Sequence, residues 1–425
     1  MTLAYLAYQG VTGLASPFLP ILLDKRMKAG KEDPGRLSER RGYASRKRPA
    51  GKLIWLHGAS IGESQVLLLL FEALREADPD ISAIITTQTL TSARMIAAKG
   101  LPGLVHQMAP VDTPFATERF LKHWQPDLAV FAEGDIWPNM IMKLDRKRIP
   151  RLLVNARMTD KSFDGWMRYK ALARKIFAGF QTILAANIRT SDYLKQFSPK
   201  RVKFTGNIKY AAPPLPADED ELAKLKGVIG ARPVLSALST HEGEEALVLD
   251  AYDTLKKTLP ELVLILAPRH PDRGDDLEAL LSGRSVYRRS TDVGLKQDQD
   301  TWLCDTLGEL GLWIRLGSVI YLGGGLEGSG VGGHNPLEPL KLDRFTFYSP
   351  EVNNFAQEFS IIHRARGADP VTSSGMLAEL ALPFLTGEKN FSPDESLLGD
   401  LLYGEAPLHA ARDAVLGALA GKRAR

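Results

Sequence analysis

The sequence predicts an α/β protein in which two doubly wound domains face a central cleft, preceded by a membrane-associated helix. Three observations support this prediction. Short apolar runs rich in β-branched residues alternate with helix-like segments, twice along the chain. A proline-rich stretch separates the two series, and the first 23 residues carry no charged side chain. Such alternation indicates βαβ units and a mainly parallel sheet in each half.

The bulk composition is that of an ordinary globular protein. With 425 residues the chain can form two or three domains with well-buried cores. The formal net charge of +4 is mild and does not indicate a nucleic-acid partner. A single cysteine, Cys304, excludes an intramolecular disulfide and fits a reducing compartment.

The N-terminal stretch "MTLAYLAYQGVTGLASPFLPILL", residues 1–23, has about the 20 residues that a spanning helix needs, although two glycines and two prolines interrupt it. No basic region precedes it, so it is not a typical secretory signal. Ten basic residues follow between Lys25 and Arg48. This order predicts an anchor at 1–23 and a basic juxtamembrane segment at 24–50 on the cytoplasmic side, against anionic lipid. A buried or amphipathic first helix is the alternative, and whether the helix spans the bilayer or lies on it stays open.

The first α/β series defines an N-terminal domain over residues 51–210. Its buried strands are expected at 52–57, 81–87, 103–109, 127–133, 151–156, 182–187 and 202–207. Helices are expected between them at Gln65–Ala77, Ser92–Lys99 and Asp164–Phe177.

The stretch "AAPPLPADEDEL", residues 211–222, is the best linker because its prolines favour an extended chain. The alternation then restarts in a C-terminal domain, residues 223–425. Its strands are expected at 233–239, 262–268, 302–306, 318–324 and 345–349. Both domains place glycine-rich segments where strands end, which predicts a ligand cleft between the carboxyl ends of the two sheets.

In the first domain, "HGASIGES" at 57–64 follows the first strand and precedes a helix. Gly58 and Gly62 permit tight turning, and free amides at the helix start can face a ligand. Glu63 is the one carboxylate of this loop. A helix N-terminus lowers its pKa, whereas burial raises it from about 4.3. The alternative is a first-turn glutamate that only complements the helix dipole.

Two further motifs of this domain carry charge. "FAEGDIWPN", 131–139, brings Glu133 and Asp135 close together after a strand, and "GNIK", 206–209, places Lys209 beside the linker. Lys209 can neutralise phosphate or developing negative charge. Taken alone, each motif is better explained by solvated or capping side chains.

In the second domain, "APRHP" at 267–271 ends a strand with Arg269, whose planar fork suits phosphate recognition. His270 has no second histidine at metal-ligand spacing and is interpreted as structural. "GGGLEGSGVGGHNPLEP", 323–339, leaves exposed backbone at a strand end and then begins a helix. Asn335 suits the cap and Pro336 the first helical position, and the amides would favour a phosphate.

A competing interpretation exists for the same glycine run. Gly323, Gly325 and Gly328 match G-x-G-x-x-G, and Asp343 lies at about the expected distance for a dinucleotide-binding protein. Asp343, however, precedes the next strand instead of ending it. The acidic triplets at 218–220 and 298–300 are interpreted as solvated turns, so no metal site is predicted.

Taken together, eight motifs resemble, in order, the 3-deoxy-D-manno-octulosonic acid (Kdo) transferase family of lipopolysaccharide and lipid A biosynthesis, over roughly residues 35–360. They are "GASIGE", "EGDIWPN", "NARMTDKSF", "GNIK", "STHEGEE", "PRHPDR", "DTLGEL" and "GGHNPLEP". The resemblance implies a GT-B architecture of two Rossmann-like domains. It also implies inverting, metal-independent transfer of Kdo from CMP-Kdo to a lipid A precursor, lipid IVA, at the cytoplasmic face of the cell inner membrane. No cofactor and no nucleic-acid partner are implied.

The resemblance also implies residue roles. Glu63 corresponds to the catalytic base, and Glu133 and Lys209 help to stabilise the transition state. The residues that correspond to the CMP-binding segments are Pro268, Arg269, Gly308, Glu309, Leu310, Asn335, Pro336, Leu337 and Glu338. The chain departs from the family pattern at Gly134 and Asp135, where Thr and Glu are usual, at Gly325, where serine is common, and at Ser349, where glycine is usual.

Other functions stay open at this point. A GT-B glycosyltransferase that uses another nucleotide sugar, a dinucleotide-dependent oxidoreductase and a catalytically silent membrane-bound nucleotide sensor are the alternatives. The number of Kdo residues added, the acyl pattern of the acceptor and the oligomeric state do not follow from the sequence.

Overall fold

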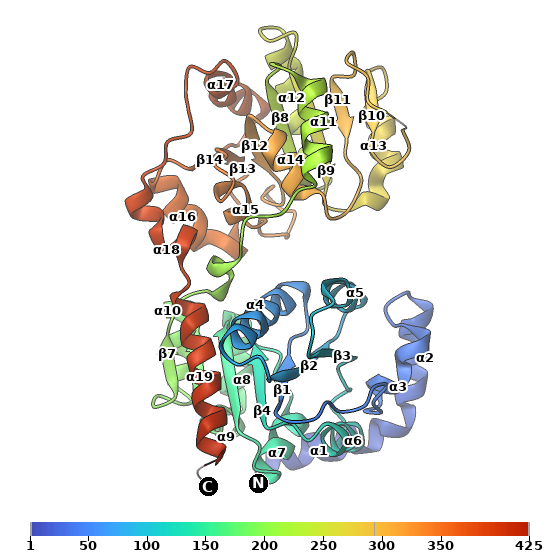
Figure 1. Cartoon of the computed structure of the whole chain (residues 1–425), viewed down its shortest axis with the longest axis vertical. Coiled ribbons are helices and arrows are strands. Elements are labelled where there is room, and N and C mark those ends of the chain that lie inside the picture. Colours follow the sequence, from blue (N-terminus) through green and yellow to red (C-terminus); the bar gives the residue numbers. More distant parts are fainter. Residues whose placement is uncertain (1, 293, 424–425) are drawn as a thin grey trace. The chain divides into compact units, whose positions relative to one another are not determined.

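The computed structural model describes residues 2–292 and 294–423, which form two compact units (Figure 1). Unit 1 comprises Met1–Ala212 together with Gly404–Arg425, and unit 2 comprises Pro213–Tyr403. The end of the chain therefore returns to the first unit. This contradicts the expectation that the second domain continues to residue 425.

The described residues of unit 1 form a seven-stranded parallel sheet in the order β3-β2-β1-β4-β5-β6-β7. Its strands are β1 (Leu53–His57), β2 (Ser82–Thr87), β3 (Leu104–Met108), β4 (Leu128–Ala132), β5 (Arg151–Ala156), β6 (Thr182–Ala185) and β7 (Val202–Phe204). Each coincides with an expected run. The strand order reverses between β1 and β4, and ligands of doubly wound sheets bind at the carboxyl ends of the strands at such a point.

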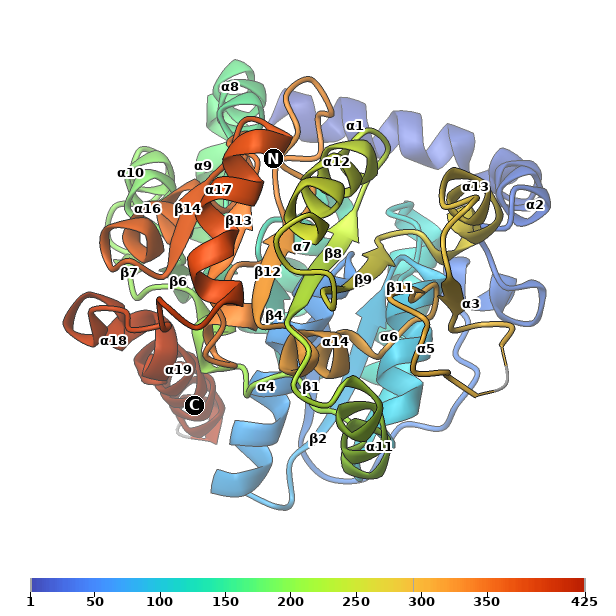
Figure 2. The same ribbon diagram turned by 90° about the horizontal axis from the view of Figure 1, so that it is seen from above.

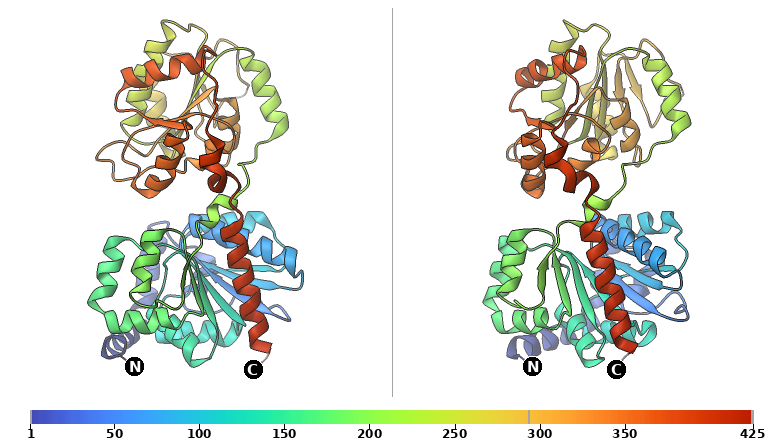
Figure 3. Two further views of the ribbon diagram at one scale, coloured as in Figure 1. Left: turned by 90° about the vertical axis from the view of Figure 1, so that its left-hand side faces the viewer. Right: turned by 60° about the vertical axis from the view of Figure 1, so that its left-hand side comes forward.

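Helices cover both faces of this sheet, with an apolar core on each side. One face is covered by α4 (Ile61–Ala77), α5 (Leu90–Lys99) and the C-terminal α19 (Ala406–Arg423), which lies beside α4 in both views of Figure 3. The other face is covered by α6 (Pro114–Trp124), α7 (Pro138–Arg146) and α9 (Lys170–Ala178). The helix expected at Asp164–Phe177 is instead two, α8 (Asp160–Arg168) and α9, because the backbone leaves the helical region at Tyr169. Helix α10 (Ile188–Lys195) connects β6 to β7.

The return of α19 has a packing cause. Ala411, Val415 and Leu419, spaced by four, are buried in the same core cluster as Val66 and Leu70 of α4. Apolar positions at this spacing lie on one face of a helix, and that face must be covered. The predicted linker is also shorter than 211–222, since α11 (Glu219–Ile229) begins within it, capped by the Asp218 side chain.

The N-terminal residues form α1 (Leu3–Ala15), a 3-10 turn at Ser16–Phe18 and α2 (Leu19–Lys28), drawn in blue-violet in Figure 2. This stretch, Leu3–Lys28, is long and apolar enough to cross a membrane. Its two sides differ sharply. Tyr5, Leu19 and Leu23 are buried against unit 1, whereas large apolar residues on the other side are exposed: Leu3, Leu6, Val11, Leu14, Phe18, Ile21 and Leu22. We call these seven exposed residues the apolar stripe.

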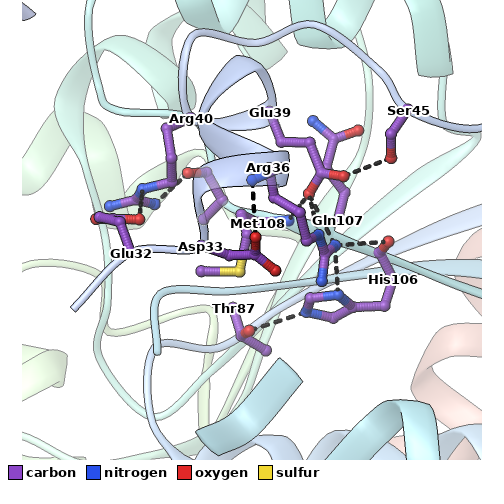
Figure 4. Close-up of polar contacts among 12 residues, drawn as sticks. Glu32, Asp33, Arg36, Glu39, Arg40, Ser45, Thr87, His106, Gln107 and Met108 are labelled. Carbon is purple, nitrogen blue, oxygen red and sulfur yellow. Dashed lines mark hydrogen bonds and ion pairs between the residues drawn. The ribbon is translucent and has the colours of Figure 1, made fainter. Parts of the chain in front are cut away.

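The basic segment 24–50 is part of the packed unit 1, which differs from the free juxtamembrane segment that we expected. Figure 4 shows Arg36 between Glu39 and His106, and Arg40 facing Glu32. The Glu39 carboxylate, 1% exposed, also accepts a hydrogen bond from the Met108 N–H of β3 at 2.7 Å. About half of the basic residues are thus paired within the fold: Arg26, Lys28, Arg36, Arg40 and Arg48. The exposed ones are Lys25, Lys31, Arg41, Arg46 and Lys47, together with Lys28, whose ion pair with Asp24 lies on the surface.

Unit 2 has a second seven-stranded parallel sheet among its described residues, in the order β10-β11-β9-β8-β12-β13-β14. Its strands are β8 (Val234–Thr240), β9 (Val263–Pro268), β10 (Val286–Arg288), β11 (Thr301–Leu303), β12 (Val319–Leu322), β13 (Thr346–Tyr348) and β14 (Ala368–Pro370). The two edge strands β10 and β14 were not expected. Its helices include α12 (Glu244–Lys256), α13 (Gly274–Leu280), α14 (Leu310–Leu316), α15 (Leu337–Leu340), α16 (Ala356–Arg364), α17 (Ser374–Leu385) and α18 (Glu395–Tyr403).

Candidate active site

Glu63 lies at the carboxyl end of β1, in the first turn of α4, where the strand order of unit 1 reverses. Ser60 caps this helix: its side chain accepts a hydrogen bond from the Glu63 N–H. The Glu63 carboxylate in turn accepts hydrogen bonds from the Ala59 N–H (2.8 Å) and the Ser60 hydroxyl (2.9 Å). Burial raises the pKa of Glu63, opposed by the Ala59 N–H and reinforced by the Glu133 carboxylate. The side chain is thus a fixed carboxylate with increased basicity.

Glu133 and Lys209 meet beside Glu63. The Lys209 Nζ donates to Glu133 Oε1 at 2.8 Å, and the Asn155 amide donates to the same oxygen at 3.4 Å. Glu133 follows β4 directly and has a left-handed backbone, φ 56°. A Cβ on Gly62 would lie 3.0 Å from Lys209 Nζ, so the absent side chain at Gly62 lets the ammonium group approach the start of α4. All three predicted catalytic residues of the first domain therefore lie at the end of β1 and β4.

Asp135 is held in a second polar cluster at the same sheet edge. His57, the last residue of β1, lies 3.0 Å from Asp135 Oδ2 through Nε2 and 2.8 Å from the Thr86 hydroxyl through Nδ1. The Gln88 amide and the Trp137 indole also donate to Asp135, at 2.5 and 2.8 Å. Burial raises the pKa of Asp135, but these hydrogen bonds and the His57 charge outweigh burial and lower it overall. Asp135 is therefore an ionised, fully engaged group and not a second base.

In unit 2 the predicted nucleotide residues follow the carboxyl ends of β9, β11 and β12. Arg269 is exposed immediately after β9, and its charge acts on Glu338. Asn335 Oδ1 accepts from the Leu337 N–H at 3.2 Å, but α15 begins at Leu337 with Pro336 in the cap position, one residue later than predicted. The Asn335 amide donates to Glu338 at 3.2 Å. Burial raises the pKa of Glu338 to about 7, although this hydrogen bond and the Arg269 charge act to lower it.

The segment Gly308–Leu310 connects β11 to α14. Gly308 has φ 88°, a left-handed conformation, and Leu310 is the first residue of the helix. The Glu309 carboxylate is held by Arg289, with Nη2 at 2.6 Å from Oε1, and by the Thr306 hydroxyl. The Glu309 side chain is thus already engaged within unit 2.

The glycine run after β12 does not offer all its amides to a ligand. Glu244, fully buried at the start of α12, accepts hydrogen bonds from the Gly324 N–H (2.8 Å), the Gly325 N–H (3.2 Å) and the His241 N–H (2.9 Å). The expectation of a bare phosphate-binding backbone at the first glycines is therefore wrong. Sequence reasoning missed this carboxylate, and its only signal was its place in "STHEGEE".

A histidine cluster was also missed. His241 Nε2 and His334 Nε2 lie 2.8 Å apart with stacked rings, and the His270 ring is 5.6 Å from that of His241. Burial, followed by the neighbouring positive charges, lowers the pKa of His334 to about 4. The cluster lies at the carboxyl ends of β8, β9 and β12, which are neighbours in the sheet.

The dinucleotide interpretation does not fit the fold. After Gly328 the chain continues as a loop to Pro336, and the helix that follows, α15, has four residues. The fingerprint needs a helix that opens at the third glycine. Within residues 2–292 and 294–423 no group of three or more His, Cys, Asp or Glu side chains is arranged to hold a metal ion.

The fold and the sequence were compared with known proteins. The family model described as 3-deoxy-D-manno-octulosonic-acid transferase (kdotransferase) matches residues 35–212. A 3-deoxy-D-manno-octulosonic acid transferase of Rickettsia bellii is 31% identical, covering 81% of this chain and 82% of that protein. The Haemophilus influenzae transferase is 32% identical, covering 83% and 84%. The chain spans 65% of the length of the Rickettsia felis and Rickettsia conorii transferases.

Among solved structures, UDP-GlcNAc 2-epimerase from Neisseria meningitidis bound to UDP-GlcNAc aligns with a TM-score of 0.56 at 12% identity, over 87% of this chain and 100% of that one. This likeness shows the two-domain fold alone. The C-terminal CMP-Kdo binding domain of WaaA from Acinetobacter baumannii is 27% identical over 45% of this chain and 96% of that one, with a TM-score of 0.38. On its identity to the curated transferases over most of their length, the chain belongs to the 3-deoxy-D-manno-octulosonic acid transferase family and is a glycosyltransferase.

Proposed function

We propose that this enzyme transfers Kdo from CMP-Kdo to a lipid A precursor, lipid IVA, by an inverting, metal-independent mechanism with Glu63 as general base. The family relationship supports Kdo transfer. The observation that carries the assignment of the base is the Glu63 carboxylate, fixed by the Ala59 N–H and the Ser60 hydroxyl at the switch point of the sheet, with its pKa raised by burial.

In the proposed reaction Glu63 removes a proton from a hydroxyl of the acceptor disaccharide. The resulting oxygen attacks the anomeric carbon of Kdo while the bond to the CMP phosphate breaks, with inversion at that carbon. Lys209 brings a positive charge to the developing negative charge, and the ion pair with Glu133 holds the ammonium in place.

The donor would bind through unit 2. Arg269 is exposed beside the glycine run and can bind the CMP phosphate through two charge-assisted hydrogen bonds. Asn335 and Glu338, already hydrogen-bonded to each other, supply acceptors for the ribose hydroxyls. Pro268, Pro336 and Leu337, with the Gly308–Leu310 turn, complete the proposed CMP site. CMP leaves as a monophosphate, and Arg269 supplies cationic charge at its phosphate.

The test is the Glu63→Gln variant. Its amide oxygen can still accept from Ala59, but it cannot take a proton, so the transfer rate should fall about 10²–10⁴-fold. Initial rates are measured with CMP-Kdo and a tetra-acylated lipid A precursor, by mass spectrometry of the lipid. Glu76→Gln, on the exposed side of the same helix, is the matched control. Turnover like that of the wild type in Glu63→Gln would remove Glu63 from the role of base.

The nucleotide is tested separately by ligand-induced stabilisation. A ligand stabilises a protein only when it binds the folded state, so CMP should raise the melting temperature more than UDP or NAD. Stabilisation by UDP alone would indicate a different donor, and stabilisation by NAD alone would indicate a different reaction. CMP binding without transfer to any lipid acceptor would indicate a nucleotide sensor.

The proposed site of action is the cytoplasmic face of the inner membrane. The α1–α2 segment packs one face on unit 1 and exposes the apolar stripe on the other, as interfacial helices do. The exposed Lys25 of α2 and Lys31 shortly after it can meet anionic lipid. We therefore place this segment on the bilayer surface and not across it.

A further inference from the structure

A cavity of about 430 Å³ lies within unit 1, between the N-terminal helices and the edge of the sheet. Its wall is mainly apolar, with Ala15, Leu19 and Leu23 on one side and Val111 and Met140 on the other. The volume falls within the range of about 300–1,000 Å³ that is typical of small-ligand pockets. None of the roles proposed above uses this cavity.

The cavity opens toward the apolar stripe. Phe18 and Leu22 line it and are 66% and 52% exposed. The same two side chains therefore belong to the cavity mouth and to the surface that we place against lipid. An alkyl chain can pass from the bilayer into the cavity at this point without crossing water, and leaving water is what favours its burial.

The mouth also carries positive charge. Arg26 and Arg40 both line the cavity and share one carboxylate: Arg26 Nε lies 2.7 Å and Arg40 Nε 3.4 Å from Glu32. Arg40 is 6% exposed and Asp112 also lines the cavity, so the partly exposed Arg26 is the cationic group that a ligand at the mouth can reach. An anionic head group matches this charge, since guanidinium groups bind phosphate through paired hydrogen bonds.

The inner end of the cavity reaches the candidate active site. His57 and Gln88 line it, and both contact Asp135 at the end of β1 and β4. Glu133 is two residues away from Asp135 in the chain, and its charge acts on Glu63. A ligand in the cavity therefore extends from the lipid-facing helix to the edge of the sheet that holds the base.

We propose that this cavity takes one fatty acyl chain of the anionic glycolipid acceptor, while Arg26 attracts its phosphate. Binding the chain here would fix the acceptor hydroxyl relative to Glu63, so the cavity is a substrate site of the transferase. This inference rests on the proposed function, because it assumes a lipid acceptor.

The first test fills the mouth of the cavity. Ala15 is exposed on α1 and lines the cavity, so Ala15→Trp adds bulk there without disturbing a packed core. We expect the KM for a tetra-acylated acceptor to rise at least tenfold in this variant, with the KM for CMP-Kdo unchanged. Ile188→Trp, at an exposed position on α10, is the matched control. An unchanged KM for the lipid in Ala15→Trp would overturn the proposal.

The second test needs neither a variant nor turnover. A lipid acceptor that carries a photoreactive diazirine on one acyl chain is bound to the wild-type enzyme in detergent and irradiated, and the labelled residues are mapped. Labels on Leu19, Val111 or Met140 are expected. Labels confined to Leu14 and Ile21 of the apolar stripe would overturn the cavity proposal. If the wild type transfers Kdo to no lipid, the proposed function is refuted instead. The labelling remains a separate result, because it requires binding of the lipid and not turnover.

Discussion

At the residue scale, the candidate site depends on pairs of charged groups whose partners lie far apart in the chain. Glu133 and Lys209 are separated by 76 residues and meet at 2.8 Å. His57 and Asp135, separated by 78 residues, meet at 3.0 Å. The Asp135 position also explains one departure from the family pattern, since an aspartate there is enclosed by His57, Gln88 and Trp137. Of the three carboxylates Glu63, Glu133 and Asp135, Glu63 is the one whose hydrogen-bond donors are all neutral.

The Lys209→Ala variant tests the electrostatic role at this scale. Removing one fixed charge that stabilises a transition state typically costs about 10²–10³ in rate, so kcat should fall by that order. Lys209→Arg should recover part of the activity, because it keeps the charge. Lys203→Ala serves as control, because Lys203 is exposed on β7, the strand that precedes Lys209 in the chain. Equal activity in Lys209→Ala and Lys203→Ala would show that Lys209 only packs against Glu133.

At the element scale, the N-terminal helix is joined to unit 1 by polar contacts as well as by burial. The Tyr8 hydroxyl donates to Asp112 at 3.1 Å, and Asn139 donates to the Thr12 hydroxyl at 2.9 Å. Asp112 also accepts the N–H groups of Asn139 and Met140 at the start of α7, at 2.9 and 2.8 Å. This aspartate therefore connects α1 to α7, and its charge state affects how firmly the helix is held.

The titration of Asp112 predicts a pH dependence. Burial raises its pKa to about 6, from 3.8. A raised carboxyl pKa means that the folded state binds more protons than the unfolded state between these two values. The contribution of Asp112 to the free energy of unfolding is therefore fully present below about pH 3.8 and is lost as the pH rises through 6. The total loss is at most about 3 kcal/mol.

Asp112→Asn removes this titration. We expect the difference in unfolding free energy between wild type and variant to change between pH 4 and pH 7, with the wild type losing stability relative to the variant. Denaturant titrations at both pH values measure it. If the unfolding free energies of wild type and variant change equally between the two pH values, the pKa of Asp112 is not raised in the folded state.

The apolar stripe gives a second prediction at this scale. Leu14 is 80% exposed, so Leu14→Glu should leave the melting temperature within about 2 °C of the wild type, as expected of a surface substitution. Its binding to anionic vesicles in high salt should fall strongly, because salt screens the basic residues and not apolar insertion. Ile188→Glu, in the same unit, is the control. Unchanged sedimentation of Leu14→Glu with vesicles would contradict the interfacial assignment.

At the scale of the whole molecule, the chain ends in the unit in which it begins. Helix α19 buries Ala411, Val415 and Leu419 against the core of unit 1. Fully burying a side chain of the size of valine or leucine is worth about 1.5–3 kcal/mol, so this helix contributes several kcal/mol to unit 1. Unit 2 has its own core, made by residues between Leu235 and Leu385.

Deleting Gly404–Arg425 should therefore destabilise unit 1 and spare unit 2. In hydrogen exchange, the amides of α4 and β4 should lose protection, whereas those of β8 and β9 should keep it. The pair Val415→Ala and Leu419→Ala should have a smaller effect of the same kind. Equal loss of protection in both units would contradict the assignment of α19 to unit 1.

The sequence alone determined the inner strands of both sheets and the loops that carry the candidate catalytic residues, whereas α4, α5 and α8 begin earlier than expected. The strands and loops follow from local rules: apolar runs for buried strands, Ser60 as a cap, and charged residues directly after strands. The tertiary structure decided what depends on distant partners. Glu244 occupies the amides of Gly324 and Gly325, His241 pairs with His334, and Glu32 and Glu39 neutralise part of the basic segment. The return of α19 to unit 1 and the cavity beside Ala15 were also decided by the tertiary structure. Each depends on which surfaces are buried together, and the order of residues along the chain does not specify this.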